Sequence, residues 1–249
     1  MKSEDLAVQL EIAKKAARES GELLLKNKKQ LNKKLMDNLK DIKLEADIRS
    51  EILIKEIINR ESNYPILAEE SGKSIENLGD TFWIIDPLDG TANYNRGIPV
   101  CCVSIGLSMN MKPILGVIYD FNNDHMYVGD KFNKSSLMNN DPIKVSNIQN
   151  KENSVLITGL PHNTDFSEES LSKMIKDMQT WKKVRMIGSA AIAACYIASG
   201  KAERYEEKGV YIWDIIAGAA IVESAGGTAE ILNIKENFQV DVVFSNSKI

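Results

Sequence analysis

Apolar and polar residues follow one another along this chain in a pattern that predicts two helices and then a series of strands. Residues 5–26 carry apolar side chains at helical spacing, and residues 46–60 repeat that spacing with a broad isoleucine face. Both stretches are therefore predicted to be amphipathic helices. Between them, residues 27–38 show no clean period, so a loop or a short hairpin is expected there.

Short apolar runs after the second helix predict strands. These strands are expected at residues 65–68, 82–85, 100–109, 114–119 and 126–129. The polar segment 110–113 ends in Pro113 and predicts a hairpin between two of them. Two helices followed by such a meander favour mixed α and β layers over a simple repeat of strand, helix and strand.

The second half of the chain alternates between strands and helices. Strands are expected at residues 154–158, 184–187, 202–205 and 242–245, and helices at residues 168–179, 190–199 and 214–225. Gly226 and Gly227 are expected to end the last helix. The polar stretch 140–153 marks a boundary, so we expect one domain over residues 1–249 with subdomains 1–140 and 141–249.

Composition excludes several classes of protein. The chain has 249 residues, 43% hydrophobic and 27% charged, with a formal net charge of −4, so a nucleic-acid partner is not expected. The N-terminus lacks the apolar core of a signal peptide, and no apolar run approaches the ~20 residues that span a bilayer. Cys101, Cys102 and Cys195 make a poor disulfide framework and are expected to be buried thiols. A cytoplasmic protein without a membrane partner is therefore the expectation.

The segment from Phe82 to Tyr94 carries the most chemical information. Its apolar run ends in Asp86, and Pro87 is expected to stop a regular continuation of the strand. Asp89 follows three residues after Asp86, and Gly90 lets the backbone approach a ligand closely. Carboxylates at the end of a buried strand need a positive partner, and Mg²⁺ prefers such oxygen ligands.

Four carboxylates are placed where elements leave the core. Glu69, Asp86 and Asp89 each follow an apolar run, and Asp214 lies at the start of a helix directly after Trp213. If these ends converge, the acids repel one another until divalent cations neutralise them. A single acid of this kind is often only a helix cap or a surface charge. The prediction of a cation site therefore depends on all four acids together.

Three motifs of this chain resemble those of the inositol monophosphatase family of Mg²⁺-dependent, lithium-sensitive phosphatases. They are Asp-Pro-Leu-Asp-Gly-Thr-Ala-Asn-Tyr at 86–94, Leu-Ala-Glu-Glu-Ser-Gly at 67–72 and Trp-Asp-Ile-Ile-Ala-Gly at 213–218. The resemblance extends from about Leu6 to the C-terminus. It implies a layered αβαβα sandwich of the inositol monophosphatase and fructose bisphosphatase type, two or three Mg²⁺ ions, and a homodimer.

The resemblance also implies roles for individual residues. Those matching metal ligands are Glu69, Asp86, Asp89, Asp214 and the main-chain carbonyl of Leu88. Gly90 and Thr91 match phosphate-binding amides, and the Thr91 hydroxyl and Glu69 match the pair that orients the attacking water. Glu70 is expected at the surface or beside the ligands rather than on a metal.

Two regions of the site depart from a simple match. Asp47 matches a supporting acid near the metals, but Leu44 stands where many relatives carry a threonine. On the substrate side, Gly188, Ser189 and Ala190 resemble a segment that contacts the sugar or cyclitol, together with Asp89 and Glu207. Glu206 is adjacent to Glu207, and the alternative for the whole segment is an ordinary helix start or a solvated loop charge.

The resemblance predicts a phosphomonoesterase in which a metal-activated water attacks a small phosphate ester, with myo-inositol 1-phosphate as the leading substrate. Alternatives are fructose 1,6-bisphosphate, 3′-phosphoadenosine 5′-phosphate and histidinol phosphate. A partner-binding regulatory protein is the non-enzymatic alternative. His125 and His162 lie in polar segments, and neither is needed as a base when a metal generates the nucleophile.

Overall fold

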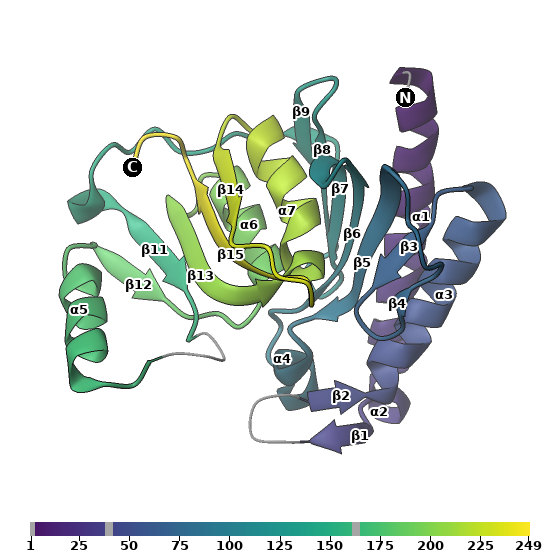
Figure 1. Cartoon of the computed structure of the whole chain (residues 1–249), viewed down its shortest axis with the longest axis horizontal. Coiled ribbons are helices and arrows are strands. Elements are labelled where there is room, and N and C mark those ends of the chain that lie inside the picture. Colours follow the sequence, from purple (N-terminus) through teal and green to yellow (C-terminus); the bar gives the residue numbers. More distant parts are fainter. Residues whose placement is uncertain (1–2, 38–41, 161–164) are drawn as a thin grey trace.

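The computed structural model describes residues 3–37, 42–160 and 165–249. Five layers follow one another across these residues (Figure 1): two helices, a large sheet, two inner helices, a second sheet and one outer helix. The mixed α+β fold and its αβαβα layering agree with the expectation from sequence. No helix in the described ranges combines the length and apolar character that crossing a membrane requires.

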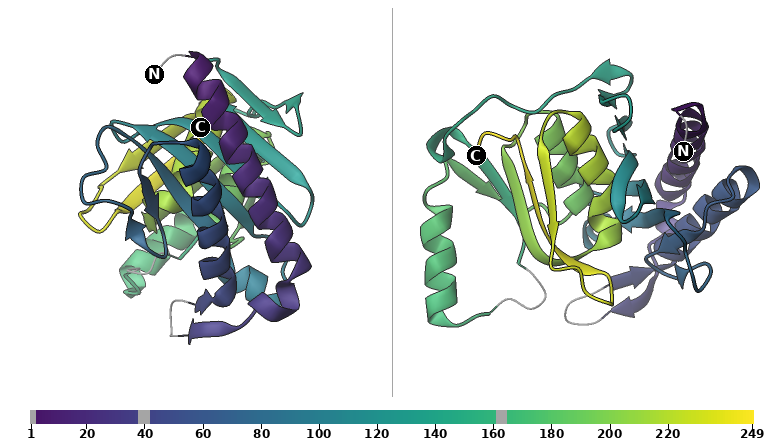
Figure 2. Two further views of the ribbon diagram at one scale, coloured as in Figure 1. Left: turned by 90° about the vertical axis from the view of Figure 1, so that its right-hand side faces the viewer. Right: turned by 45° about the horizontal axis from the view of Figure 1, so that its top comes forward.

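The first layer consists of the two predicted helices, α1 (Ser3–Lys26) and α3 (Glu45–Glu61). They pack side by side on one face of the large sheet (Figure 2, left). Two buried hydroxyls connect them, because Ser20 and Ser50 lie 2.6 Å apart. Ser50 also donates a hydrogen bond of 2.6 Å to the carbonyl oxygen of Pro87. This layer is therefore tied to the strand that carries the Asp-Pro-Leu-Asp motif.

A short hairpin precedes α3. It consists of β1 (Lys34–Asp37) and β2 (Ile42–Leu44), which pair antiparallel, and it follows the single turn α2 (Lys28–Leu31). The sequence predicted a loop or short hairpin over residues 27–38, and this region holds α2 and β1; Asn38 lies outside the described residues.

Eight strands form the large sheet in the order β10-β9-β8-β7-β6-β5-β3-β4. Their bounds are β3 (Ile66–Ala68), β4 (Gly72–Lys73), β5 (Thr81–Asp89), β6 (Cys102–Met109), β7 (Lys112–Asp120), β8 (His125–Asp130), β9 (Ser135–Met138) and β10 (Asp141–Pro142). β3 and β5 run parallel, with Ala68 opposite Ile85, whereas the other neighbouring strands pair antiparallel. The carboxyl ends of β3 and β5 therefore meet at one edge of the sheet.

The strand β5 is longer than the sequence predicted. It was expected to end at Ile85, but it continues through Pro87 to Asp89 with a register shift between Asp86 and Asp89 against β6. Proline lacks the N–H that a regular ladder needs, and a bulge accommodates it. Pro87 therefore deflects the strand instead of ending it.

Three glycines form a row across β6, β7 and β8. Gly106 pairs with Gly116, and Gly116 pairs with Gly129. A Cβ atom at Gly116 would lie 2.9 Å from the Cα atom of Ala217, closer than real Cβ contacts. The row lets the backbone of the next layer lie directly against the sheet.

The inner layer consists of α6 (Ala190–Ala198) and α7 (Ile212–Ser224), which separate the two sheets. α7 contacts β5 to β8 of the large sheet on one side and the second sheet on the other. A helix that is apolar all round belongs in such a position. Its buried residues are Ile212, Ile215, Ile216, Ala217, Gly218, Ala219, Ala220, Ile221 and Val222.

The second sheet has the strand order β12-β11-β13-β15-β14. Its strands are β11 (Val155–Thr158), β12 (Lys183–Arg185), β13 (Arg204–Tyr211), β14 (Thr228–Leu232) and β15 (Gln239–Ser245). The outer helix α5 (Glu168–Met178) lies beyond this sheet (Figure 1) and has no buried residue. The prediction of a strand at 202–205 was wrong in extent, because β13 begins later and continues to Tyr211. The edge strand β14 was not predicted.

Candidate functional site

The parallel pair β3 and β5 brings the first acids together. Glu69 follows β3 directly, and its N–H donates a 3.2 Å hydrogen bond to the carbonyl oxygen of Ile85, next to Asp86. Asp89 ends β5, where the bulge turns the strand. Asp214 enters from the inner layer as the third residue of α7. Sequence reasoning placed all four acids at element ends. Asp86 instead lies within β5, but the structure still brings the four acids into one region.

The environment of these acids disfavours negative charge. Asp86 is 2% exposed and Asp89 8% exposed, and burial raises the pKa of both carboxyls. Burial and next the charge of Asp89 raise the pKa of half-buried Asp214. Glu69 is exposed as a whole residue, yet the protein atoms around its carboxyl and next the charge of Asp214 raise its pKa. Burial therefore raises the pKa of all four carboxyls, and the charge of a neighbouring acid raises it further for Glu69, Asp86 and Asp214.

Among the described residues, no cationic side chain pairs with the four acids, and the acids do not yet form a set of metal ligands. Within the described ranges, no salt bridge involves Glu69, Asp86, Asp89 or Asp214. As the side chains lie, no three His, Cys, Asp or Glu residues of the described part could hold a metal ion together. Several carboxylate oxygens point to other partners: Asp86 accepts from the N–H of Leu88 at 2.9 Å, and Asp214 accepts from the N–H of Tyr211 at 2.8 Å. Shared binding of a cation thus requires side-chain rotation.

The start of α6 holds Asp89 in place. Oδ2 of Asp89 accepts hydrogen bonds from the Ser189 hydroxyl at 2.5 Å and from the Ala191 N–H at 2.8 Å. Ser189 also caps α6 through the N–H of Ile192. The predicted substrate segment Gly188-Ser189-Ala190 therefore lies beside a predicted metal ligand. Its serine contacts the protein's own acid.

Asn93 connects this segment to the motif helix α4 (Thr91–Arg96). Its side-chain amide donates to the carbonyl oxygens of Val100 and Ile187, both at 2.8 Å. Gly188 has a positive φ of 70°, a conformation that glycine adopts without a steric penalty. The motif contained Asn93, but sequence reasoning gave it no role, because its partner Ile187 is distant in the chain.

Thr91 and Asp47 lie within hydrogen-bond distance of each other. Oγ1 of Thr91 is 2.9 Å from Oδ1 of Asp47 and 3.0 Å from the Leu88 carbonyl oxygen, and it donates to one of them at a time. Asp47 is 1% exposed, and burial raises its pKa to about 7. The N–H of Leu44 donates to Oδ2 of Asp47 at 2.7 Å, so the missing threonine hydroxyl does not displace this acid.

Gly90 shapes the turn that starts α4. Its φ of 86° is left-handed, and a Cβ atom there would lie 2.7 Å from the Val100 carbonyl oxygen. Only glycine fits both restrictions. The first N–H groups of a helix have no partner inside the helix, so those at the start of α4 can bind a ligand. Gly90 and Thr91 are thus suited to contact an anion.

Glu207 faces the acid region from the second sheet. Burial raises the pKa of this half-buried carboxyl, the charge of Asp89 raises it further, and Tyr205 donates a 3.0 Å hydrogen bond to it. The charge of Glu207 in turn contributes to the raised pKa of Asp214. Glu206 instead pairs with Arg204 at 2.7 Å. Of the two adjacent glutamates, Glu207 is the one beside the site.

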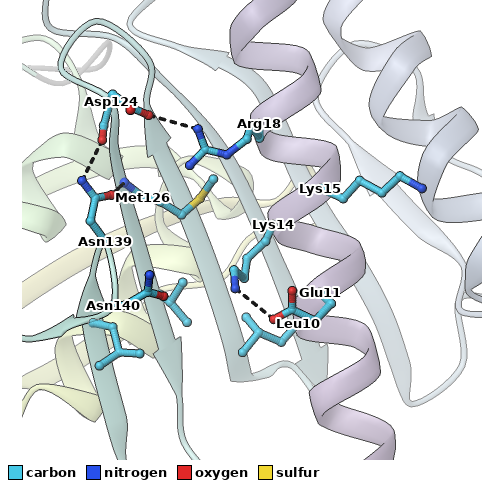
Figure 3. A pocket seen from close by; sticks show the side chains of 11 residues that line it. Leu10, Glu11, Lys14, Lys15, Arg18, Asp124, Met126, Asn139 and Asn140 are labelled. Atoms are coloured by element: carbon cyan, nitrogen blue, oxygen red, sulfur yellow. Dashed lines mark hydrogen bonds and ion pairs between the residues drawn. The ribbon is translucent and has the colours of Figure 1, made fainter.

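A separate pocket opens between α1 and the strands β8 and β9 (Figure 3), and it does not include the acids. Its charged groups already have partners: Lys14 pairs with Glu11, and Arg18 pairs with Asp124. Lys15 is directed away from it in Figure 3.

Of the two histidines, His125 starts β8, which β7 and β6 separate from β5, and His162 lies outside the described residues. The candidate site is therefore the acid region.

Comparison with known proteins extends over almost the whole chain. The sequence profile of the inositol monophosphatase family matches residues 5–246. The chain is 33% identical to "Nus factor SuhB" of Xylella fastidiosa over 220 residues, covering 86% of this chain and 78% of that protein. It is 36% identical to "Inositol-1-monophosphatase" of Synechocystis over 189 residues, covering 75% of this chain and 66% of that protein.

A solved structure shows the same architecture. The inositol monophosphatase of Anabaena (Nostoc) superposes with a TM-score of 0.85 at 33% identity, covering 98% of this chain and 93% of that one. The sequence profile, the relatives and this structure agree with the fold described above. This chain belongs to the inositol monophosphatase family and is a phosphatase.

Proposed function

We propose that the protein is a Mg²⁺-dependent phosphomonoesterase that hydrolyses a small polyol or sugar phosphate, with myo-inositol 1-phosphate as the first candidate. The observation that carries this proposal is the meeting of four acids with raised pKa values and, in the described residues, no salt bridge to any of them. Fructose 1,6-bisphosphate, 3′-phosphoadenosine 5′-phosphate and histidinol phosphate are the alternative substrates.

The donor set fits Mg²⁺. Carboxylate and carbonyl oxygens are the ligands that this ion prefers, and water and phosphate oxygens complete its shell. Glu69, Asp86, Asp89, Asp214 and the Leu88 carbonyl would hold two or three ions after the carboxylates rotate. Bound Mg²⁺ would neutralise phosphate charge and make a water more acidic. Removal of the acids' mutual repulsion would then favour the rotated arrangement.

The residues around Thr91 are suited to orient the attacking water. While the Thr91 hydroxyl donates to Asp47 at 2.9 Å, its oxygen can accept a hydrogen bond from that water. Glu69 would accept the second hydrogen bond and fix the direction of attack. The N–H groups of Gly90 and Thr91 would bind the phosphate oxygens. This arrangement needs no phosphorylated protein side chain.

The substrate's alcohol would lie on the side of the inner layer and the second sheet. Asp89 and Glu207 are acceptors there for hydroxyl groups, and Gly188, Ser189 and Ala190 form the adjoining wall. Ser189 already binds Asp89 at 2.5 Å, so its main contribution would be to orient that carboxylate. A polyol with several hydroxyl groups suits this set of acceptors better than an apolar alcohol does.

The decisive experiment measures phosphate release from the four candidate esters with EDTA and with added Mg²⁺. We expect turnover of one ester only with Mg²⁺, and an Asp89→Asn variant at least about a hundredfold slower, since several kcal/mol of charge stabilisation are lost. The thermal midpoint of the variant checks that it remains folded. Lithium is expected to inhibit the active reaction, and undiminished turnover in high lithium would argue against that part.

A second candidate function is regulation by binding a protein partner. The observation in its favour is the name "Nus factor SuhB" among the similar proteins. The Asp89→Asn variant separates the two functions in cells of the source organism. If the variant fully replaces the wild-type gene, the essential role is binding; if it does not, the role requires phosphatase activity.

We also propose a homodimer in a reducing, cytoplasmic setting. The three cysteines are free and buried, which agrees with such a setting. The exposed apolar residues Phe166 and Ile175, on and beside the outer helix, offer a surface for a second copy. Light scattering coupled to size exclusion measures the molar mass directly; a mass of one chain, about 27.8 kDa, would reject the homodimer.

A further inference from the structure

One ion pair joins the two sides of the acid region and has no role in the reaction described above. Lys43, in β2, pairs with Glu70, which directly follows Glu69. The two side chains are 30% and 10% exposed, so this pair is more shielded than the surface pairs of α1. Ion pairs at the surface contribute little, whereas a shielded pair between distant segments restrains their relative position.

Both ends of the pair connect to groups that would orient the water. After Lys43, the N–H of Leu44 holds Asp47 at 2.7 Å, and Asp47 lies 2.9 Å from the Thr91 hydroxyl. Before Glu70, Glu69 is fixed to β5 through its own N–H. The pair therefore connects the Asp47 side of the site with the Glu69 side.

Glu70 is also held from a third direction. Its N–H donates to Oε2 of Glu51 at 2.9 Å, and Glu51, which is 4% exposed, belongs to α3. Lys55, one turn further along α3, lies 3.7 Å from Glu51 and donates to Ser71 at 2.8 Å. With its backbone fixed in this way, Glu70 can serve as a firm anchor for Lys43.

We propose that Lys43 is a positioning residue whose ion pair with Glu70 sets the spacing between Asp47 and Glu69. This proposal rests on the phosphatase mechanism proposed above. Loss of the pair would leave the phosphate ligands in place but would loosen the orientation of the water. Misplacement of reacting groups by about 1 Å can cost up to about a hundredfold in rate, so a loss in kcat of roughly tenfold is expected.

The test is a double-mutant cycle with Lys43→Met, Glu70→Gln and the double variant, assayed on the best substrate. If the two residues act as one unit, each single variant loses roughly tenfold in kcat, and the double variant is no slower than either. KM should stay within about twofold of the wild type, and Lys43→Arg should recover most of the rate. The control is Lys15→Met, which removes a 2.6 Å pair between α1 and α3 and should leave the kinetics unchanged.

A second readout needs no turnover. Amide hydrogen exchange of the metal-free protein should show faster exchange of the Leu44 and Glu70 amides in both single variants, with no further gain in the double variant. Additive losses in kcat would overturn the proposal, because the two residues would then act independently. A rise in KM at unchanged kcat would also overturn it and would make Lys43 a direct substrate contact. Unchanged exchange would overturn it as well. If the wild type hydrolyses no ester, the mechanism fails by itself, and the exchange data alone decide whether the pair positions these segments.

Discussion

The inner and outer helical layers of this molecule are held in different ways. α7 lies between two sheets with nine buried residues, and its backbone rests on the glycine row of Gly106, Gly116 and Gly129. The outer helix α5 lies beyond the second sheet with no buried residue. Asp214 and Ser189 belong to the inner layer, whereas no candidate site residue lies on α5. Asp214 and Ser189 thus lie at the starts of helices that cannot move without disturbing both sheets.

The largest expected effect comes from Gly116→Val. A side chain there would collide with the backbone of Ala217, so α7 would have to leave the sheet. We expect a loss of about 3 kcal/mol or more in the free energy of unfolding, typical of severe overpacking. Urea denaturation measures it. Ser172→Val, on exposed α5, is the matched control and should change stability by less than about 0.5 kcal/mol. Equal denaturation midpoints would contradict the difference between the layers.

The second-largest effect is expected for the change of stability with pH. Burial raises the pKa of Asp47 from 3.8 to about 7, so the folded protein binds the proton more tightly than the unfolded chain. The metal-free protein should therefore lose stability as pH rises from about 4 to 7, by an amount on the order of a few kcal/mol. Asp47→Asn should be more stable than the wild type at pH 8 in EDTA, as measured by urea denaturation.

For Asp177 on α5, stability is expected to change with pH in the opposite direction. A hydrogen bond from Lys151 lowers its pKa, so its contribution to stability is present above the unfolded pKa and is lost as pH falls. Asp177→Asn should thus be no more stable than the wild type at pH 8. A wild-type protein that gains stability in EDTA between pH 5 and 8 would contradict the proposed repulsion among the site acids.

Ser189→Ala should affect activity more than stability. The substitution removes the 2.5 Å hydrogen bond to Asp89, and loss of such a partner of a metal ligand typically costs about 10- to 100-fold in activity. It also removes a helix cap, worth about 1 kcal/mol. Ser167→Ala is the matched control, because Ser167 caps α5 in the same manner. Kinetics and thermal midpoints of both variants are compared; similar activity losses would show that capping alone explains the effect.

The smallest effect is expected for Ile175→Lys. Ile175 is 49% exposed on α5, and lysine is a good helix former, so the free energy of unfolding should change by less than about 0.5 kcal/mol. Thermal denaturation measures it. A loss above about 2 kcal/mol would mean that α5 is packed as firmly as the inner layer. If the proposed homodimer uses this surface, light scattering should show a lower molar mass for the variant.

Much of the fold follows from local pattern, and what local pattern misses has physical causes. α1 and α3 were predicted because their apolar residues repeat at helical spacing. Pro87 was read as a stop, but a bulge lets β5 continue to Asp89. β14 was not predicted because this edge strand (Thr228–Leu232) has only half-buried and exposed residues and no apolar run.

The candidate site shows the same division. The acids at 69, 86, 89 and 214 could be found because each follows an apolar run or starts a helix, and family motifs surround them. Their partners could not. The pairs of Asp89 with Ser189 and of Lys43 with Glu70 join residues 100 and 27 positions apart, and only the folded chain brings them together. The functional assignment of these residues stays a prediction until it is tested.

The position of α7 has a consequence for how the protein is made. One face of the large sheet is covered by residues 212–224, which leave the ribosome long after the strands they cover. Until then the glycine row and its apolar surroundings stay exposed on the nascent chain, and such surfaces promote aggregation and recruit chaperones. Asp214, the acid that α7 contributes to the site, is placed when α7 packs onto the sheet. The onset of phosphatase activity during synthesis should therefore coincide with closure of the core, so that turnover reports on the completion of folding.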